Sequence, residues 1–245
     1  MTGQPVLVAV PGTMCSPAVF EPLARALAGQ VRVDPVSWLT EPGPWDIPAV
    51  AERLGRHIDQ TWNGGPVAVC GHSTGGAIAL QLAISRPQTV LGLVLADTGA
   101  HMRGHGDVDA ILDRIRTSWG EELCRGVLDR SFHIPPPPQV RAGLLAWAAA
   151  LDPRAVHDVL ASQRDLDLTP GLARVTMPAV VVHGRHDRVR PLEQGRELAR
   201  SLPDARLRLA EAGHTPVWET PEVVATAVRE VLARAGSAPE AERSG

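Results

Sequence analysis

Short, continuous apolar runs alternate with segments of helical spacing along most of the chain. Such runs are typical of strands that are buried on both faces of a parallel sheet. The alternation predicts a doubly wound α/β sheet with helices on both faces. The expected strands occupy residues 6–10, 31–36, 67–70, 90–96, 179–183 and 205–209, and the expected helices occupy residues 16–28, 50–62, 77–85, 192–201 and 221–235.

The pattern changes between residues 99 and 172, where no convincing buried strand occurs. Four helical stretches follow one another there, at 108–119, 121–129, 140–150 and 155–164. Four consecutive prolines at 135–138 interrupt them and should form a stiff spacer. We therefore expect residues 99–172 to be a helical lid inserted into a core made of residues 1–98 and 173–235, and residues 236–245 to be a flexible tail.

Composition restricts the possible functions more than it selects one. The 245 residues include 44% hydrophobic and 21% charged residues, as in an ordinary soluble domain. The net charge of -3 provides no basic field for nucleic acid or for an anionic membrane. The first residues lack the features of a signal peptide, and no apolar stretch is long enough to span a membrane. Three scattered cysteines fit neither a metal site nor a disulfide framework, so we expect a cytoplasmic protein without a metal.

A serine between the third expected strand and the helix after it has the surroundings of a nucleophile. Ser73 is the centre of Gly71-His72-Ser73-Thr74-Gly75, which matches the pattern G-x-S-x-G. That pattern has meaning only between a strand and a helix, and both are expected here. The small neighbours permit a tight, strained turn that lifts the hydroxyl above the carboxyl edge of the sheet. A glycine-rich turn with a serine cap is the alternative interpretation.

A serine hydroxyl needs a histidine to accept its proton, and the histidine needs an acid that fixes its tautomer. Of the nine histidines, His214 lies in the loop after the last expected strand, which leaves the same edge of the sheet as Ser73. Asp187, after the fifth expected strand, leaves that edge too. Asp97, after the fourth, is the rival acid, but its position at the start of the expected lid favours Asp187. The sequence thus predicts a triad of Ser73, Asp187 and His214.

Acyl transfer also needs backbone N–H groups that stabilise the developing oxyanion. Thr74, directly after Ser73, should supply one of them. The loop after the first strand should supply the other, with Thr13 as the first choice and Met14 as the next. Pro11 in this loop has no N–H and is excluded. An ordinary turn at the end of a strand is the alternative interpretation of the loop.

The lid should close over a largely apolar pocket. The expected substrate-binding residues are Met14, Trp119, Trp147 and Trp218. For the tryptophans the alternative is packing: Trp119 and Trp147 within the lid helices, and Trp218 as an anchor of the last helix. The expected partner is a small apolar molecule, and the sequence predicts no oligomeric state.

Taken together, four segments resemble the α/β-hydrolase superfamily along nearly the whole chain. They are Val8-Ala9-Val10-Pro11-Gly12-Thr13, Gly71-His72-Ser73-Thr74-Gly75-Gly76, His183-Gly184-Arg185-His186-Asp187 and Gly213-His214-Thr215-Pro216-Val217-Trp218-Glu219. The resemblance implies a mostly parallel sheet of about six strands, a lid, no required cofactor and a two-step acyl-enzyme mechanism. Two departures are Pro11, where members usually carry histidine, and the lack of an antiparallel hairpin before the first strand.

The likeness is greatest to small esterases and enol-lactone hydrolases, so the first hypothesis is hydrolysis of a carboxylic ester or lactone through an acyl-enzyme on Ser73. The string Gly-His-Ser-Thr-Gly-Gly also occurs in cofactor-free haloperoxidases, or perhydrolases. A second hypothesis keeps the triad in a biosynthetic lyase, cyclase, C–C hydrolase or acyltransferase. A third is a ligand-binding receptor that has kept the fold. Motifs alone do not separate these outcomes.

Overall fold

The computed structural model describes residues 4–237 and is centred on one six-stranded sheet. All strands are parallel, in the order β2-β1-β3-β4-β5-β6. The strand order reverses between β1 and β3, and crevices at the carboxyl ends of such strands are the usual binding sites of open α/β sheets. The strands are β1 (Val6–Val10), β2 (Arg32–Pro35), β3 (Val67–His72), β4 (Val90–Ala96), β5 (Ala179–Gly184) and β6 (Ala205–Ala210).

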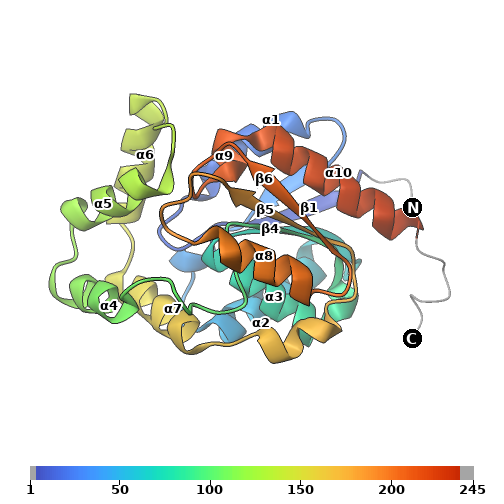
Figure 1. Ribbon diagram of the computed structural model, residues 1–245, viewed down its shortest axis with the longest axis horizontal. Helices are drawn as coiled ribbons and strands as arrows, with labels where there is room; N and C mark the ends of the chain where they lie inside the picture. The colour runs from blue at the N-terminus through green and yellow to red at the C-terminus, as the bar shows by residue number, and fades with distance from the viewer. Residues whose placement is uncertain (1–3, 238–245) are drawn as a thin grey trace.

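Helices cover both faces of this sheet, which confirms the predicted doubly wound fold. In Figure 1, α1, α9 and α10 lie on one face, and α2, α3 and α8 lie on the other. None of the described helices is both long and apolar enough to cross a membrane. These helices are α1 (Glu21–Ala26), α2 (Ile47–Thr61), α3 (Thr74–Ser85), α8 (Leu192–Ser201), α9 (Pro216–Glu219) and α10 (Pro221–Ser237).

The apolar runs of the strands are continuous because each strand supplies two cores. In β3, Val69 packs into the core on the side of α2 and α3, whereas Cys70 packs into the core on the side of α1 and α10. Both side chains are fully buried. Successive side chains of a strand point to opposite faces, so a strand covered on both sides needs apolar residues at every position.

Four further helices are inserted between β4 and β5, and we call α4 to α7 the helical insertion. They lie together at the left-hand end of the sheet in Figure 1. Asp107 and Asp152 cap the first and the last of them, each through a side chain that accepts a backbone N–H. The four prolines connect the middle two, and Pro138 already begins α6. The helices are α4 (Val108–Thr117), α5 (Glu121–Ser131), α6 (Pro138–Ala149) and α7 (Pro153–Asp165).

Several local predictions differ from the structure, as three examples show. The helix expected at 16–28 is divided into a 3₁₀ turn at Pro17–Phe20 and α1, since Pro22 cannot donate the N–H that a continuous helix would need there. The short helix α9 was not predicted, because four residues are too few to show a period. The last helix continues to Ser237, so the first two residues of the expected tail are helical. Residues 238–245 of that tail lie outside the described residues.

Two isoleucines offer a matched test of how much the core contributes to stability. Ile78 in α3 is fully buried, whereas the side chain of Ile134 is 66% exposed. We expect Ile78→Ala to lower the free energy of unfolding by about 2–5 kcal/mol, because it leaves a cavity. Ile134→Ala should change it by less than about 0.5 kcal/mol. Urea unfolding of both variants measures the difference, and equal effects would contradict the packing described here.

Candidate active site

The backbone at Ser73 forms a tight turn between β3 and α3. Ser73 adopts φ 54° and ψ −122°, a left-handed conformation that is rare for residues other than glycine. A Cβ on Gly71 would overlap the backbone of Gly75, and a Cβ on Gly75 would overlap the carbonyl oxygen of Val10. The Ser73 N–H donates to the carbonyl of Ala96 at 2.9 Å. The turn is therefore fixed by close backbone contacts that only glycine permits.

Ser73, His214 and Asp187, which are far apart in the sequence, meet at the carboxyl edge of the sheet. The His214 Nε2 atom lies 2.9 Å from Ser73 Oγ, and His214 Nδ1 lies 2.7 Å from Asp187 Oδ2. The side chains of His214 and Asp187 are only 5% and 1% exposed. This arrangement lets one ring nitrogen of His214 accept the serine proton while the other donates to the carboxylate.

Asp187 is held as an anion by its surroundings. Burial alone would raise the pKa of its carboxyl, but the charge of His214 and several hydrogen bonds hold that pKa well below its usual range. Two of these bonds come from backbone N–H groups: Val189 and Arg190 donate to Oδ1 at 2.7 and 2.9 Å. The carboxylate is thus fixed in place and charged beside the imidazole.

His72, the residue before the serine, supports the loop of His214. Its ring is fully buried, and its Nε2–H donates to the backbone carbonyl of His214 at 2.7 Å. Burial, with a smaller effect of the His214 charge, lowers the pKa of His72 to about 3, so the ring is neutral. The sequence placed His72 only beside the nucleophile, because a contact between residues 142 positions apart leaves no local signal.

The loop after β1 places Thr13 next to Thr74, the two residues predicted to supply oxyanion donors. Thr13 Oγ1 donates to Thr74 Oγ1 at 2.8 Å, and Thr74 Oγ1 donates to Gln163 Oε1 at 2.8 Å. No acceptor within residues 4–237 pairs with the backbone N–H of Thr13 or of Thr74. Met14 turns the loop with φ 64°. A hydrogen bond also holds the start of the loop, since the indole N–H of Trp38 donates to the Pro11 carbonyl at 2.9 Å.

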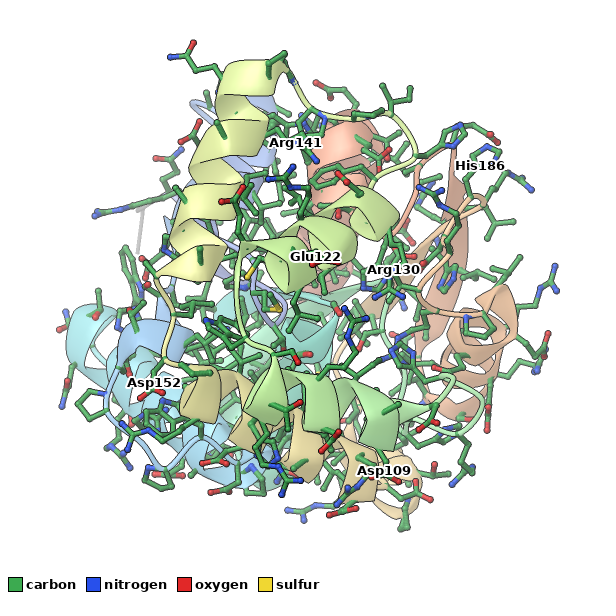
Figure 2. All side chains as sticks on the ribbon, turned by 90° about the vertical axis from the view of Figure 1, so that its left-hand side faces the viewer. Asp109, Glu122, Arg130, Arg141, Asp152 and His186 are labelled. Atoms are coloured by element: carbon green, nitrogen blue, oxygen red, sulfur yellow. The ribbon has the colours of Figure 1, made fainter. Side chains whose placement is uncertain are left out.

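A cavity of about 110 Å³ opens above Ser73, between the edge of the sheet and the helical insertion. Most of its wall is apolar, and polar side chains gather near the serine. Met14, one of the expected substrate-binding residues, lines this cavity. His105 also lines it, as do Gln163 and Arg130, to which the sequence did not point; Figure 2 shows Arg130 on α5. The apolar wall consists mainly of Met14, Met102, Val108, Ile111, Ile115, Leu123, Val127 and Leu160.

The three predicted tryptophans do not line this cavity, and the structure corrects their assignment. Trp119 and Trp147 pack against the core on the α2 and α3 side, which includes buried residues of the insertion. Trp218, which belongs to α9, packs against the opposite core. The interpretation of all three as packing residues is therefore the better one. Apolar spacing marks the buried face of a helix without saying whether that face meets a cavity or a neighbouring helix.

Glu219 links the helical insertion to the loop that carries His214. Its Oε1 accepts the N–H of Gly213 at 2.9 Å, and its Oε2 accepts the N–H groups of His133 and Ile134 at 2.8 and 2.9 Å. A second link lies close by, since the Thr215 hydroxyl donates to the Ser131 carbonyl at 2.9 Å. The segment that follows α5 is therefore joined to both sides of His214.

One cluster beside the site has the spacing of a metal centre. Asp97, His183 and Asp187 each offer a ligand atom, and these atoms lie within 4.8 Å of one another. However, Asp187 Oδ2 already accepts from His214, and the His183 Nε2–H donates to the Arg190 carbonyl at 3.2 Å. The guanidinium of Arg190 is also buried nearby. We assign the cluster to a hydrogen-bonded network.

Removal of the Glu219 carboxylate should loosen the link between the insertion and the His214 loop. In Glu219→Gln, one of the two oxygens becomes an N–H₂ group that faces N–H donors. We expect the free energy of unfolding to fall by about 2 kcal/mol, since hydrogen bonds to a charged acceptor are lost. Amide exchange at Gly213, His133 and Ile134 should become faster. Glu222→Gln, at an exposed position on α10, is the matched control. Unchanged exchange in Glu219→Gln would show that the link is not formed in solution.

Comparisons with known proteins show which family the chain belongs to. Residues 7–227 match the model of the alpha/beta hydrolase family. The polyketide synthase ThaQ of Burkholderia thailandensis is 32% identical over 233 residues, which cover 86% of this chain but only 11% of the synthase. A pimeloyl-[acyl-carrier protein] methyl ester esterase of Aromatoleum aromaticum is 29% identical over 249 residues, covering 94% of this chain and 98% of that enzyme.

A solved structure shows the same fold. The enol-lactonase of Burkholderia xenovorans superimposes with a TM-score of 0.81 at 23% identity, covering 94% of this chain and 92% of that one. This likeness extends to the six-stranded sheet with helices on both faces. The match to the family model covers most of the chain, so the protein is an enzyme of the alpha/beta hydrolase family.

Proposed function

We propose that the protein hydrolyses a small carboxylic ester or lactone through an acyl-enzyme on Ser73. The observation that carries this proposal is the position of His214, within hydrogen-bonding distance of both Ser73 Oγ and Asp187 Oδ2. A hydroxyl is a poor nucleophile near neutral pH, and a histidine placed in this way removes its proton as attack begins. The carboxylate of Asp187 fixes the tautomer with the proton on Nδ1 and stabilises the imidazolium that forms.

In the first step, Ser73 Oγ attacks the carbonyl carbon and its proton passes to His214 Nε2. In this proposal the oxyanion is stabilised by the backbone N–H groups of Thr74 and Thr13, for which the described residues offer no acceptor. His214 then returns the proton to the departing alcohol oxygen, which leaves the acyl group on Ser73. A water molecule activated by His214 releases the acid and restores the serine.

The cavity favours a substrate with an apolar acyl chain. Its wall is formed by aliphatic side chains and methionines, with the amide of Gln163 and the guanidinium of Arg130 among its few polar groups. We propose that the helical insertion acts as a lid over this cavity. The likeness to pimeloyl-[acyl-carrier protein] methyl ester esterases makes methyl esters of medium-length acyl chains the first substrates to assay. Elimination, C–C cleavage, acyl transfer and perhydrolysis are distinguished from hydrolysis by product analysis.

Ser73 should react with a fluorophosphonate, because the reagent needs an activated serine next to oxyanion donors. We expect the intact mass to increase by one adduct in the wild-type protein and to stay unchanged in Ser73→Ala. Ester and lactone hydrolysis should be lost in the same variant. If the wild-type protein remained unlabelled although small esters reached the cavity, the acyl-enzyme mechanism would be wrong.

The space inside the cavity should limit the length of the acyl chain that a substrate can have. Ile111 of α4 lines the cavity. We expect Ile111→Phe to lower kcat/KM for long acyl chains by about tenfold, and to leave short acyl chains unaffected, because a pocket discriminates by about 1–3 kcal/mol per methylene. Ile134→Phe, at an exposed position of the same insertion, is the control. An equal loss for short and long chains would place the acyl group elsewhere.

A further inference from the structure

Asp97 is a fully buried acid beside the proposed triad, and one of its oxygens lacks a partner. It follows β4, with φ 46°. Its Oδ1 accepts the N–H of Gly184 at 2.9 Å, which joins the ends of β4 and β5. Its Oδ2 is buried without a hydrogen-bond partner among residues 4–237. A buried carboxyl oxygen with no donor is unfavourable, so this atom needs a physical explanation.

A carboxyl oxygen of Asp187 lies within 4.8 Å of a carboxyl oxygen of Asp97, so the charges of the two groups interact strongly if both are ionised. The oxygens of Asp187 already accept from two backbone N–H groups and from His214. Two ionised carboxylates in contact repel strongly in a buried site, and such a pair is stable when one member keeps its proton. The protonated member then becomes a donor to the other.

The buried charges around Asp97 and Asp187 determine which of the two acids keeps the proton. The titratable groups that face Asp97 are Asp187, His183 and Arg190, with His214 beyond Asp187. Burial lowers the pKa of Arg190 to about 10, so its guanidinium stays charged at neutral pH. Burial also lowers the pKa of His183, whose ring is therefore neutral. Among the groups that face Asp97 directly, Arg190 supplies the positive charge, and ionised Asp187 already balances it.

The remaining acid is Asp97, and its surroundings favour the neutral form. Burial, and then the charge of Asp187, raises the pKa of Asp97 well above its usual range. The N–H of Gly184 and the charge of Arg190 act in the opposite direction but do not compensate. Asp187, in contrast, receives the hydrogen bonds that stabilise an anion.

We infer that Asp97 carries a proton on Oδ2 and donates it in a hydrogen bond to Asp187, and that Asp97 is a positioning residue for the triad. This inference rests on the proposed function of Ser73, His214 and Asp187. The neutral acid holds the Asp187 carboxylate without adding a second negative charge next to His214. A neutral Asp97 can therefore lie beside Asp187, which is the aspartate that contacts His214.

Replacing Asp97 with two different residues separates a neutral donor from a charged acid. Asp97→Asn keeps a neutral side chain that can donate to Asp187 and accept from Gly184, and asparagine tolerates the left-handed backbone. Asp97→Gly removes the side chain without straining φ 46°. We expect the glycine variant to lose about tenfold or more in kcat with KM unchanged, and the asparagine variant to recover most of this loss. Asp187→Asn should lose roughly 10⁴-fold, as expected for a wrong tautomer.

An infrared measurement tests the proton without relying on activity. The difference spectrum between the wild type and Asp97→Asn should contain the carbonyl band of a protonated carboxylic acid, shifted in deuterated water. Absence of that band, or a loss in Asp97→Asn as large as in Asp187→Asn, would mean that Asp97 is ionised. Wild-type kcat in Asp97→Gly would rule out a positioning role. Failure of the proposed function itself is distinguishable, since Ser73→Ala would then keep its activity whatever the infrared band showed.

Discussion

The turn at Ser73 is held between β1 and α3 by backbone atoms that leave no room for side chains at Gly71 and Gly75. Within this turn Ser73 has a left-handed conformation, and such a conformation persists only where the surrounding structure holds it. Because the turn ends β3 and begins α3, it fixes the direction of both elements. It also fixes the position of the Ser73 hydroxyl, which the side chain of His214 has to reach from another loop. The remaining parts of the site are arranged around that fixed point.

Two kinds of contact bring those groups to the serine. The parallel sheet places the loops after β1, β3, β5 and β6 at the same edge. Buried hydrogen bonds then align the side chains: Asp187 is held by backbone N–H groups, and the loop of His214 is held by His72 and Glu219. Hydrogen bonds in a buried site are stronger than those in water, but a buried polar group without a partner destabilises the fold. The helical insertion takes part through Gln163 and through the segment after α5.

The sequence predicted those parts of the molecule that repeat or that depend on local chemistry. The six strands and the helices around them followed from apolar periodicity, and the meeting of Ser73, Asp187 and His214 followed from the rule that parallel strands end at one edge. Long-range contacts were not accessible. Gln163 lies 89 positions from Thr74, and nothing in its own neighbourhood distinguishes it from a surface glutamine. The tryptophans were misplaced because periodicity identifies a buried face but not what that face meets. Asp97 was recognised only as a rival acid, since its relation to Asp187 depends on charges brought together by folding.

The central claim is that Ser73 becomes acylated during turnover. A rapid-mixing experiment with a chromogenic ester tests it directly, followed by intact-mass analysis of the acid-quenched protein. The account predicts a burst of alcohol approaching one equivalent per protein chain if deacylation is the slower step. It also predicts a mass increase equal to the acyl group, and neither signal in Ser73→Ala. Steady turnover with no acyl adduct at any quench time, retained in Ser73→Ala, would contradict the account and would mean that the ester is cleaved without a covalent intermediate on this serine.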